Sequence, residues 1–375
     1  MANVVRGQVE AEAMGEALGR STLAALPPVF MDAGAEAASC NEGNRPAKAR
    51  SEPSTKAVLS LAQALATSGT LEDAVYTAAA DALTRRGAAL DAAEVSGAPQ
   101  AWRSWKDQSR PHVLSEQPDI CILWKPAGWT VSIDSEEDPW GSASLNSSAS
   151  AGTGGRQLQD WVVAQLGPSF RISVDAGAGY GLVHRLDRDT SGAIVCATSY
   201  RGYFLAQLQF ATRRVRKDYV ALCHGHLLAV PRFLQAPLGG LRQADGSWRS
   251  FVDPSGRRAL TEICSVGHLV CEEGSHVSLV EVRLHTGRQH QIRAHLAAEG
   301  HPLVGDTIYG GHLHRWCSRT FLHAHHISLD VGAGQMASEC PLPDDLRGAL
   351  AALVASDGTE TQVGSAAMLD KWLSM

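Results

Sequence analysis

Between residues 112 and 330 the chain alternates between two hydrophobic patterns. Short apolar runs rich in Val, Ile and Leu predict strands, which span 119–124, 192–197, 218–223, 260–264, 276–284 and 322–329. Three other segments place apolar residues at helical spacing, namely 157–166, 203–212 and 289–299. The alternation lacks the regular repeat of a parallel βαβ sheet, so we predict an α+β fold with a largely antiparallel sheet.

The N-terminal part has a different pattern. Residues 1–55 mix Ala, Glu, Gly and Ser without a sustained period, which predicts a disordered or weakly helical leader. Residues 56–111 begin with a helical pattern that breaks at Ser68 and Gly69, and we expect Thr70 to cap a second helix. This helical extension is expected to pack on the rest of the chain, while an RNA-facing role stays open.

The remaining segments complete the predicted domain organisation. The main domain is expected over residues 112–354, followed by a C-terminal tail over 355–375. Within that domain, residues 141–155 are rich in Ser and Gly, which predicts a flexible surface loop. The loop lacks the Lys-Ser/Thr pair of a phosphate-binding loop, so we do not expect it to bind a nucleotide.

Composition and charge narrow the classes of protein. Apolar residues make up 44% of the chain and charged residues 19%, and no apolar run approaches the length of a membrane span. The eight cysteines contain no C-x-x-C pair, which favours a reducing compartment without saying which one. The net charge of −6 is unusual for a nucleic-acid binder, but all 15 histidines fall between His112 and His326, which marks this stretch as the functional part.

The segment Gly181-Leu-Val-His-Arg-Leu-Asp-Arg-Asp-Thr-Ser-Gly192 concentrates charge just before an apolar strand. A carboxylate flanked by arginines in a tight turn suits attack on an electron-poor sugar carbon, or stabilisation of an oxocarbenium-like centre. An exposed turn with local ion pairs is the alternative that this segment alone leaves open.

The same segment resembles the signature of RluA-type pseudouridine synthases, in which the aspartate after His-Arg-Leu is catalytic. Four further blocks occur in that family's order, at 125–128, 216–221, 286–293 with 300–306, and 322–324. The resemblance covers about residues 112–354 and implies the pseudouridine synthase fold, with a mixed sheet, a central catalytic cleft and no cofactor.

The resemblance also implies a catalytic set. Asp187 is the expected catalytic residue, either as a nucleophile at C1′ of the sugar or as a base at C2′. Tyr219 is expected to stack under the target base and to help with the proton at C5, although the residue alone fits a half-buried strand tyrosine. Arg293 is expected to pair with Asp187 and keep it ionised, although a surface position on a helix is its alternative.

Further residues are candidates for RNA contact. Arg185 is expected to fill the gap left by a flipped nucleotide, or else to contact phosphate or Asp187. The densest basic run is the best candidate for backbone phosphates, although a solvated face is the alternative; it comprises Arg213, Arg214, Arg216 and Lys217. His184, Arg288 and His290 lie inside the signature blocks and complete the predicted RNA-binding set.

Alternative functions follow from the same residues. Short histidine spacings occur at 224/226, 312/314 and 323–326, but without a Cys pair or H-E-x-x-H we predict no metal site.

The expected partner is RNA, either tRNA or rRNA, bound by a monomer without an obligate protein partner. Competing hypotheses are an inactive RNA-binding protein of the same fold, and a glycosidase that uses Asp187 and Asp189. Many bacterial members begin with an S4-like domain that residues 1–111 do not resemble, so the RNA target stays open.

Overall fold

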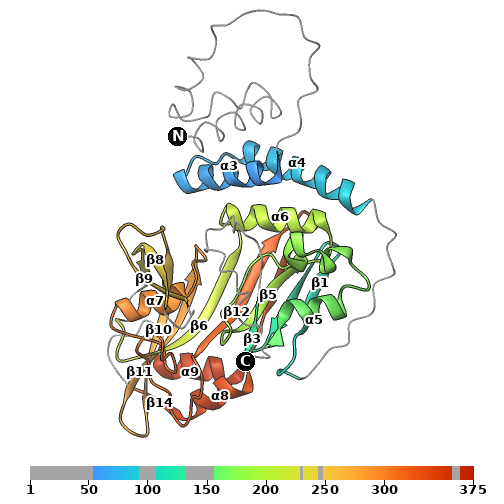
Figure 1. Cartoon of the computed structure of the whole chain (residues 1–375). Helices are drawn as coiled ribbons and strands as arrows, with labels where there is room; N and C mark the ends of the chain where they lie inside the picture. The colour runs from blue at the N-terminus through green and yellow to red at the C-terminus, as the bar shows by residue number, and fades with distance from the viewer. Residues whose placement is uncertain (1–53, 93–106, 132–155, 229–230, 244–247, 357–363) are drawn as a thin grey trace, which may run out of the picture.

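A ten-stranded sheet forms the centre of the computed structural model (Figure 1). The structure describes residues 54–92, 107–131, 156–228, 231–243, 248–356 and 364–375. The strands follow one another across the sheet in this order: β1 (His112–Gln117), β2 (Ile120–Lys125), β5 (Ser191–Ala197), β12 (Leu322–Asp330), β6 (Arg216–His224), β11 (His276–Leu284), β10 (Thr261–Cys271) and β14 (Leu353–Ala355). Two more strands extend it, since β13 (Gln335–Glu339) pairs with β12 and β7 (Arg232–Leu234) pairs with β10.

Strand directions confirm the predicted fold class. Among the described strands of this sheet, β5 and β12 pair in parallel and every other neighbouring pair is antiparallel. Each of the six predicted strands overlaps an observed one. Two small sheets lie outside the main one: β3 (Trp129–Thr130) with β4 (Arg156–Gln157), and β8 (Leu238–Arg242) with β9 (Trp248–Val252).

Side chains of the central strands point alternately into two separate apolar cores. In β6, Tyr219 and Ala221 join the cluster that contains Leu186, whereas Val220 and Leu222 face the cluster built with the C-terminal helices. This period of two is what a strand buried on both faces requires. It places Tyr219 on the same side of the sheet as the Asp187 segment.

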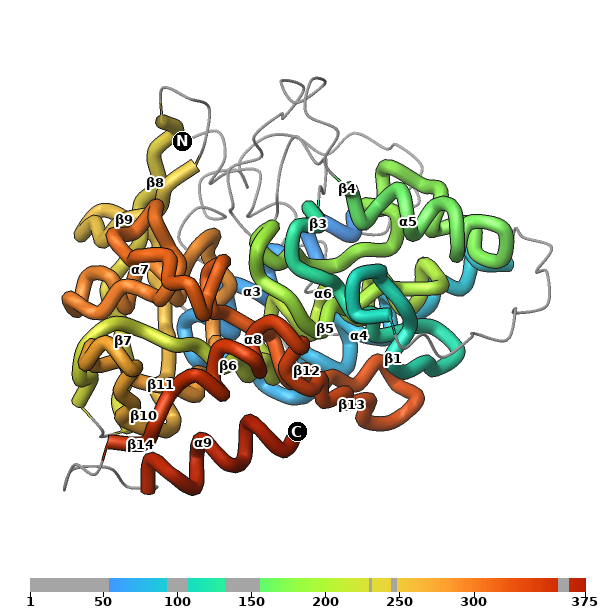
Figure 2. The backbone as a smooth tube through the Cα atoms, turned by 90° about the horizontal axis from the view of Figure 1, so that it is seen from below, coloured from blue at the N-terminus to red at the C-terminus, as the bar shows by residue number. Residues whose placement is uncertain are grey.

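Helices cover both faces of the sheet. The three predicted helices appear as α5 (Leu158–Gln165), α6 (Tyr200–Ala211) and α7 (Gln291–Ala298). Two more, α8 (Asp344–Ala351) and α9 (Ser365–Ser374), pack near the end of the chain. Residues of α5 and α7 belong to the apolar cluster on one face, whereas α6, α8 and α9 pack in the clusters on the other face. Figure 2, seen from below, shows α8 and α9 nearer the viewer than α3 and α4.

The C-terminal segment is part of the packed structure. The sequence pattern predicts a tail over 355–375 and no helix there. In α9, however, Trp372 is fully buried and its indole N–H donates to Glu281 on β11 over 3.0 Å. A buried tryptophan removes a large apolar area from water, so α9 contributes to the stability of the core.

Two N-terminal helices dock on α6 (Figure 1), namely α3 (Thr55–Ser68) and α4 (Asp73–Asp91). Gly69 ends α3 in the left-handed conformation, but the predicted cap of α4 was wrong, because Glu72 and not Thr70 occupies that position. The Asp91 carboxylate accepts the N–H groups of Tyr200 at 2.8 Å and Arg201 at 3.1 Å, and so caps α6.

Close packing between α4 and α6 depends on Gly87, and this predicts the sign of a substitution. A Cβ atom at Gly87 would overlap the backbone of Arg201. We expect Gly87→Ala to lower the free energy of unfolding by about 1–3 kcal/mol, although alanine favours an isolated helix by about 1 kcal/mol. Gly348→Ala in α8 is the matched control, because a Cβ there meets nothing within 4 Å and the gain in helix propensity should stabilise. Denaturant unfolding measures both, and a stabilised Gly87→Ala would contradict the docking.

Several expectations concern segments outside these ranges. Nearly all of the predicted leader, residues 1–55, and the whole Ser/Gly loop, residues 141–155, lie outside the described residues. Within the described ranges, seven cysteines are free thiols. No helix in the same ranges is long and apolar enough to cross a membrane.

Candidate active site

Lys125 holds the segment that carries Asp187. This lysine at the end of β2 is fully buried, and its ammonium group donates to the carbonyl oxygens of Pro126 at 3.0 Å, Arg188 at 3.1 Å and Thr190 at 2.7 Å. Burial lowers the pKa of Lys125 to about 7, against the opposing effect of Asp187 and Asp189. Lys125 lies in the signature block 125–128, but the sequence alone indicated no role for it.

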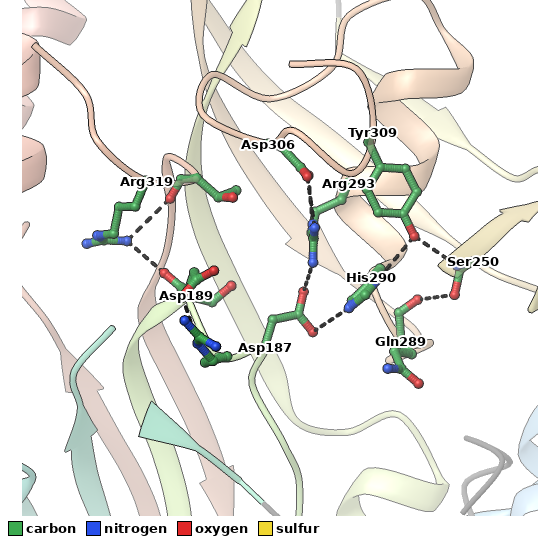
Figure 3. Close-up of polar contacts among 12 residues, drawn as sticks. Asp187, Asp189, Ser250, Gln289, His290, Arg293, Asp306, Tyr309 and Arg319 are labelled. Carbon is green, nitrogen blue, oxygen red and sulfur yellow. Dashed lines mark hydrogen bonds and ion pairs between the residues drawn. The ribbon is translucent and has the colours of Figure 1, made fainter. Parts of the chain in front are cut away.

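Asp187 has a cation beside one oxygen and a histidine beside the other (Figure 3). Oδ2 accepts a hydrogen bond from Arg293 Nη1 at 3.2 Å, and Oδ1 lies 3.8 Å from His290 Nε2. Its side chain is 18% exposed. Burial raises the pKa of the Asp187 carboxyl, but His290, Arg293 and Arg185 together bring it below its ordinary value. The carboxylate is therefore ionised at neutral pH.

Arg293 lies between two carboxylates. Nε and Nη2 bind both oxygens of Asp306 at 2.7 and 2.8 Å, while Nη1 reaches Asp187. The Asp306 side chain is only 1% exposed, and the ring of Tyr309 lies 5.0 Å from the guanidinium carbon. Since the bidentate pair fixes the plane of the guanidinium, it also fixes where Nη1 points. Asp306 and Tyr309 were not predicted as site residues, although the block 300–306 contains the aspartate.

Tyr219 lies in β6 on the Asp187 side of the sheet. It is 7% exposed and belongs to the same apolar cluster as Leu186 and Ile292, which adjoin Asp187 and Arg293 in the chain. Burial raises the pKa of the Tyr219 phenol well above its ordinary value, and the nearby charges of Asp187 and Asp218 add to the effect. The phenol is therefore protonated at any physiological pH. The structure thus brings all three predicted catalytic residues into one region.

His184 has an internal role. Its Nε2 accepts the backbone N–H of Val195 on β5 at 2.9 Å, and its ring lies 4.8 Å from that of Phe210. Burial, and to a lesser degree the charge of Lys217, lower the pKa of His184 to about 3. The neutral ring thus fastens the segment before Asp187 to the sheet, and its predicted RNA contact stays a prediction.

The low pKa of His184 predicts an acid-sensitive fold. The unfolded ring titrates near pH 6.5, so its stabilising effect is complete above that pH and is lost as the pH falls toward 3. In that window the free energy of unfolding should fall by up to about 1.4 kcal/mol per pH unit for this ring. His184→Gln keeps an acceptor for Val195 without a proton to bind, so its unfolding should depend less steeply on pH. Equal slopes for both proteins in urea unfolding between pH 6 and 4 would rule out this linkage.

Asp189 binds two arginines, Arg188 through its carboxylate and Arg319 through its backbone. Its carboxylate lies 3.5 Å from Arg188 and is 52% exposed, and its backbone carbonyl accepts a bond from Arg319 at 2.9 Å. Arg319 also pairs with Asp345 on α8 at 2.6 Å. Asp189 therefore anchors the loop through its backbone, and its charge is placed at the surface.

Two arginines of the predicted basic run are bound within the protein. Arg214 pairs with Asp73 of α4 at 2.9 Å and lies over the ring of Tyr76 at 3.9 Å. Arg216 pairs with Asp218 at 2.7 Å. Both side chains remain partly exposed, at 41% and 54%. Their contacts favour a role in docking the N-terminal helices and in ordering the start of β6.

The remaining predicted RNA-binding cations around Lys217 lie close enough to affect one another's charge. Lys217 lies 5.6 Å from the ring of Phe210, and burial with the nearby charges of Arg213 and Arg288 lowers the pKa of Lys217 to about 8. Arg213 contacts Thr67 of α3 at 3.4 Å and has a positive φ of 59°. Because the three cations repel one another, an anion would stabilise them. Arg185, in the Asp187 loop, is exposed.

The clustered histidines pack against one another. His224 lies 5.4 and 5.5 Å from the rings of His312 and His314, and His226 stacks on His268 at 4.5 Å. In the part of the chain that the structure describes, no group of three or more His, Cys, Asp or Glu side chains is arranged to hold a metal ion. These rings belong to the packing of the loops.

Comparisons with known proteins find RNA pseudouridine synthases among the similar proteins. The family model described as RNA pseudouridylate synthase matches residues 119–298. An uncharacterised RNA pseudouridine synthase of Bacillus subtilis is 36% identical over 167 residues, which are 44% of this chain and 53% of that protein. One from Zymomonas mobilis is 34% identical over 164 residues, 43% of this chain and 73% of that protein. The ribosomal large subunit pseudouridine synthase D of Nitrosomonas europaea is 36% identical over 183 residues, 46% of this chain and 51% of that protein.

A solved structure shows the same fold. The human RNA pseudouridylate synthase domain containing 1 protein matches 72% of this chain and 98% of its own with a TM-score of 0.51, at 22% identity. The matched part of this chain spans little more than half the length of the first curated relatives, between 51% and 56%. The residues that the family model matches, 119–298, include the Asp187 segment and α7 and do not include α3 and α4.

Proposed function

The chain belongs to the RNA pseudouridylate synthase family, and from this premise we propose that it isomerises uridine to pseudouridine within RNA. The bond from sugar C1′ to base N1 breaks, the freed uracil turns, and C1′ bonds to C5. C5 loses its proton and N1 gains one. Atoms and electrons balance within the nucleotide, so the reaction calls for no cofactor. The target nucleotide has to leave its stack to reach the enzyme.

The pairing of Asp187 with Arg293 supports this function most directly. Attack at C1′ and removal of a proton at C2′ both need a charged carboxylate, and the lowered pKa of Asp187 supplies one. The two routes stay open, since the same carboxylate serves either. The side chain of Asp187 is partly exposed, so its carboxylate is accessible to a ribose.

Tyr219 and the basic residues support the binding of an extruded base. The raised pKa of Tyr219 keeps its hydroxyl protonated, which favours stacking of the ring under the base over service as a phenolate base at C5. Arg185 is placed to fill the vacated position in the RNA or to bind a phosphate. Arg213, Lys217 and Arg288 are the proposed phosphate contacts, because the charges of Arg213 and Arg288 lower the pKa of Lys217 and an anion would relieve this repulsion.

The proposed substrate is a structured RNA, either tRNA or rRNA, bound by the monomeric chain. Two matched relatives, from Zymomonas mobilis and Nitrosomonas europaea, are named for the ribosomal large subunit. Purified chain should be incubated with tRNA and with rRNA transcripts, and the digested nucleosides analysed for pseudouridine and free uracil. Pseudouridine without released uracil is the expected result. No product would favour an inactive RNA-binding protein, and free uracil would favour a hydrolase. Mapping pseudouridines in cells that lack the chain would then identify the position.

A further inference from the structure

A line of polar groups leads from the β8–β9 hairpin to Asp187 (Figure 3). The backbone N–H of Ser250 on β9 donates to the hydroxyl of Tyr309 at 2.8 Å. That hydroxyl lies 3.1 Å from Nδ1 of His290, whose Nε2 lies 3.8 Å from Oδ1 of Asp187. The function proposed above gives Ser250 and Tyr309 no role, and it uses His290 only through its effect on the pKa of Asp187.

The chemistry of the groups gives this line a direction. An amide N–H can only donate, so the Tyr309 oxygen accepts from Ser250 and has its own proton to place. The acceptor that the described residues offer this proton is Nδ1 of His290. A neutral imidazole that accepts at Nδ1 carries its proton on Nε2, which faces Asp187. The other tautomer would direct a lone pair at the carboxylate.

We propose that Tyr309, held by Ser250, fixes His290 in the Nε2–H tautomer, so that His290 serves as a second donor to Asp187 opposite Arg293. The inference rests on the proposed function, because it concerns the carboxylate that the reaction uses. Arg293 holds Oδ2 and His290 faces Oδ1, so the two together set the rotation of the carboxylate. A separation of 3.8 Å exceeds a hydrogen bond, and catalytic hydrogen bonds commonly tighten when substrate binds.

The backbone supports the same arrangement. His290 has a φ of 52°, a left-handed conformation directly before α7, which orients its ring between Asp187 and Tyr309. The Ser250 hydroxyl donates to the carbonyl oxygen of Gln289 at 2.7 Å, so one hairpin residue anchors both the loop and the tyrosine. Burial lowers the pKa of His290, with Asp187 opposing, which keeps the ring neutral near pH 7. Displacement of the hairpin would therefore disturb the donor to Asp187.

Nitrogen NMR tests the tautomer without any assay of activity. The full chain labelled with 15N-histidine should show a His290 signal with an unprotonated Nδ1 and a protonated Nε2, assigned by its loss in His290→Asn. Tyr309→Phe should shift His290 toward a mixture of tautomers. A protonated Nδ1 in the unmodified chain would overturn the proposal, as would an unchanged signal in Tyr309→Phe.

Two replacements of His290 separate its donor from its backbone role. Asparagine tolerates the left-handed conformation well but has no donor at the Nε2 position, whereas glutamine extends an amide N–H to that position. We expect His290→Asn to keep its folding stability and lose roughly tenfold or more in kcat, and His290→Gln to be less stable but more active than His290→Asn. If kcat instead follows folding stability, the donor role is refuted.

Tyr309→Phe removes the hydroxyl alone. The expected result is a fall in kcat of roughly tenfold with little change in KM, since RNA binding does not depend on this tautomer. Tyr203→Phe, a similar change on α6 outside the site, is the matched control and should keep its kcat. Equal kcat values in the two variants would overturn the role of Tyr309. If the unmodified chain forms no pseudouridine, the proposed function fails, while the NMR measurement still decides the tautomer.

Discussion

Asp187→Asn should abolish pseudouridine formation, with a fall in kcat on the order of 10⁴-fold or more. The amide has nearly the shape of the carboxylate and can still accept the bond from Arg293, so folding and RNA binding should survive. What disappears is the negative charge that either chemical route requires. Single-turnover pseudouridine formation, together with an RNA-binding titration, measures the two effects separately.

Asp189→Asn is the matched control for this substitution. It lies two residues away in the same loop, but its carboxylate is half exposed, and among the residues that the structure describes it pairs only with Arg188, at 3.5 Å. Exposed pairs of this kind contribute about 0–1 kcal/mol, so turnover and stability should change little. Retained turnover in Asp187→Asn, or an equal loss in both variants, would remove Asp187 from its proposed role.

Replacing Arg293 should damage both stability and turnover. Arg293→Met leaves Asp306 without its partner at 1% exposure, and removal of one member of a buried ion pair costs about 3–5 kcal/mol. Asp187 also loses its hydrogen bond, so kcat should fall by roughly 100-fold. Denaturant unfolding and the pseudouridine assay measure the two losses.

A double variant separates these two effects. Arg293→Met combined with Asp306→Asn removes both charges of the buried pair, so much of the stability should return. Turnover should not return, because Asp187 still lacks its cation. A single variant as stable as the unmodified chain would contradict the buried pair. A double variant that regains turnover would show that Arg293 acts only through folding.

The main strands and helices were predictable because their signal is local. Strand β6 and helix α6 show the periods of two and about 3.6 that backbone geometry imposes on buried faces. Features without such a local period were missed. The cap of α4 is Glu72 and not the predicted Thr70. Helix α9 was not predicted, since the partners of Trp372 include Glu281 and His325 on strands far away in the chain.

The sequence by itself determined the family and the fold class, and it led to the proposal of Asp187 as the catalytic residue, because Asp187 lies in a contiguous signature. The tertiary structure alone decided the partners of that aspartate. Arg293 is 106 residues away in the chain, and Asp306 and Tyr309 reach the site from a separate loop. It also showed that Arg214 and Arg216 have internal partners. Local spacing fixes which face of a strand or helix a side chain occupies, whereas pairing between distant charges depends on strand order and register, which no local pattern encodes.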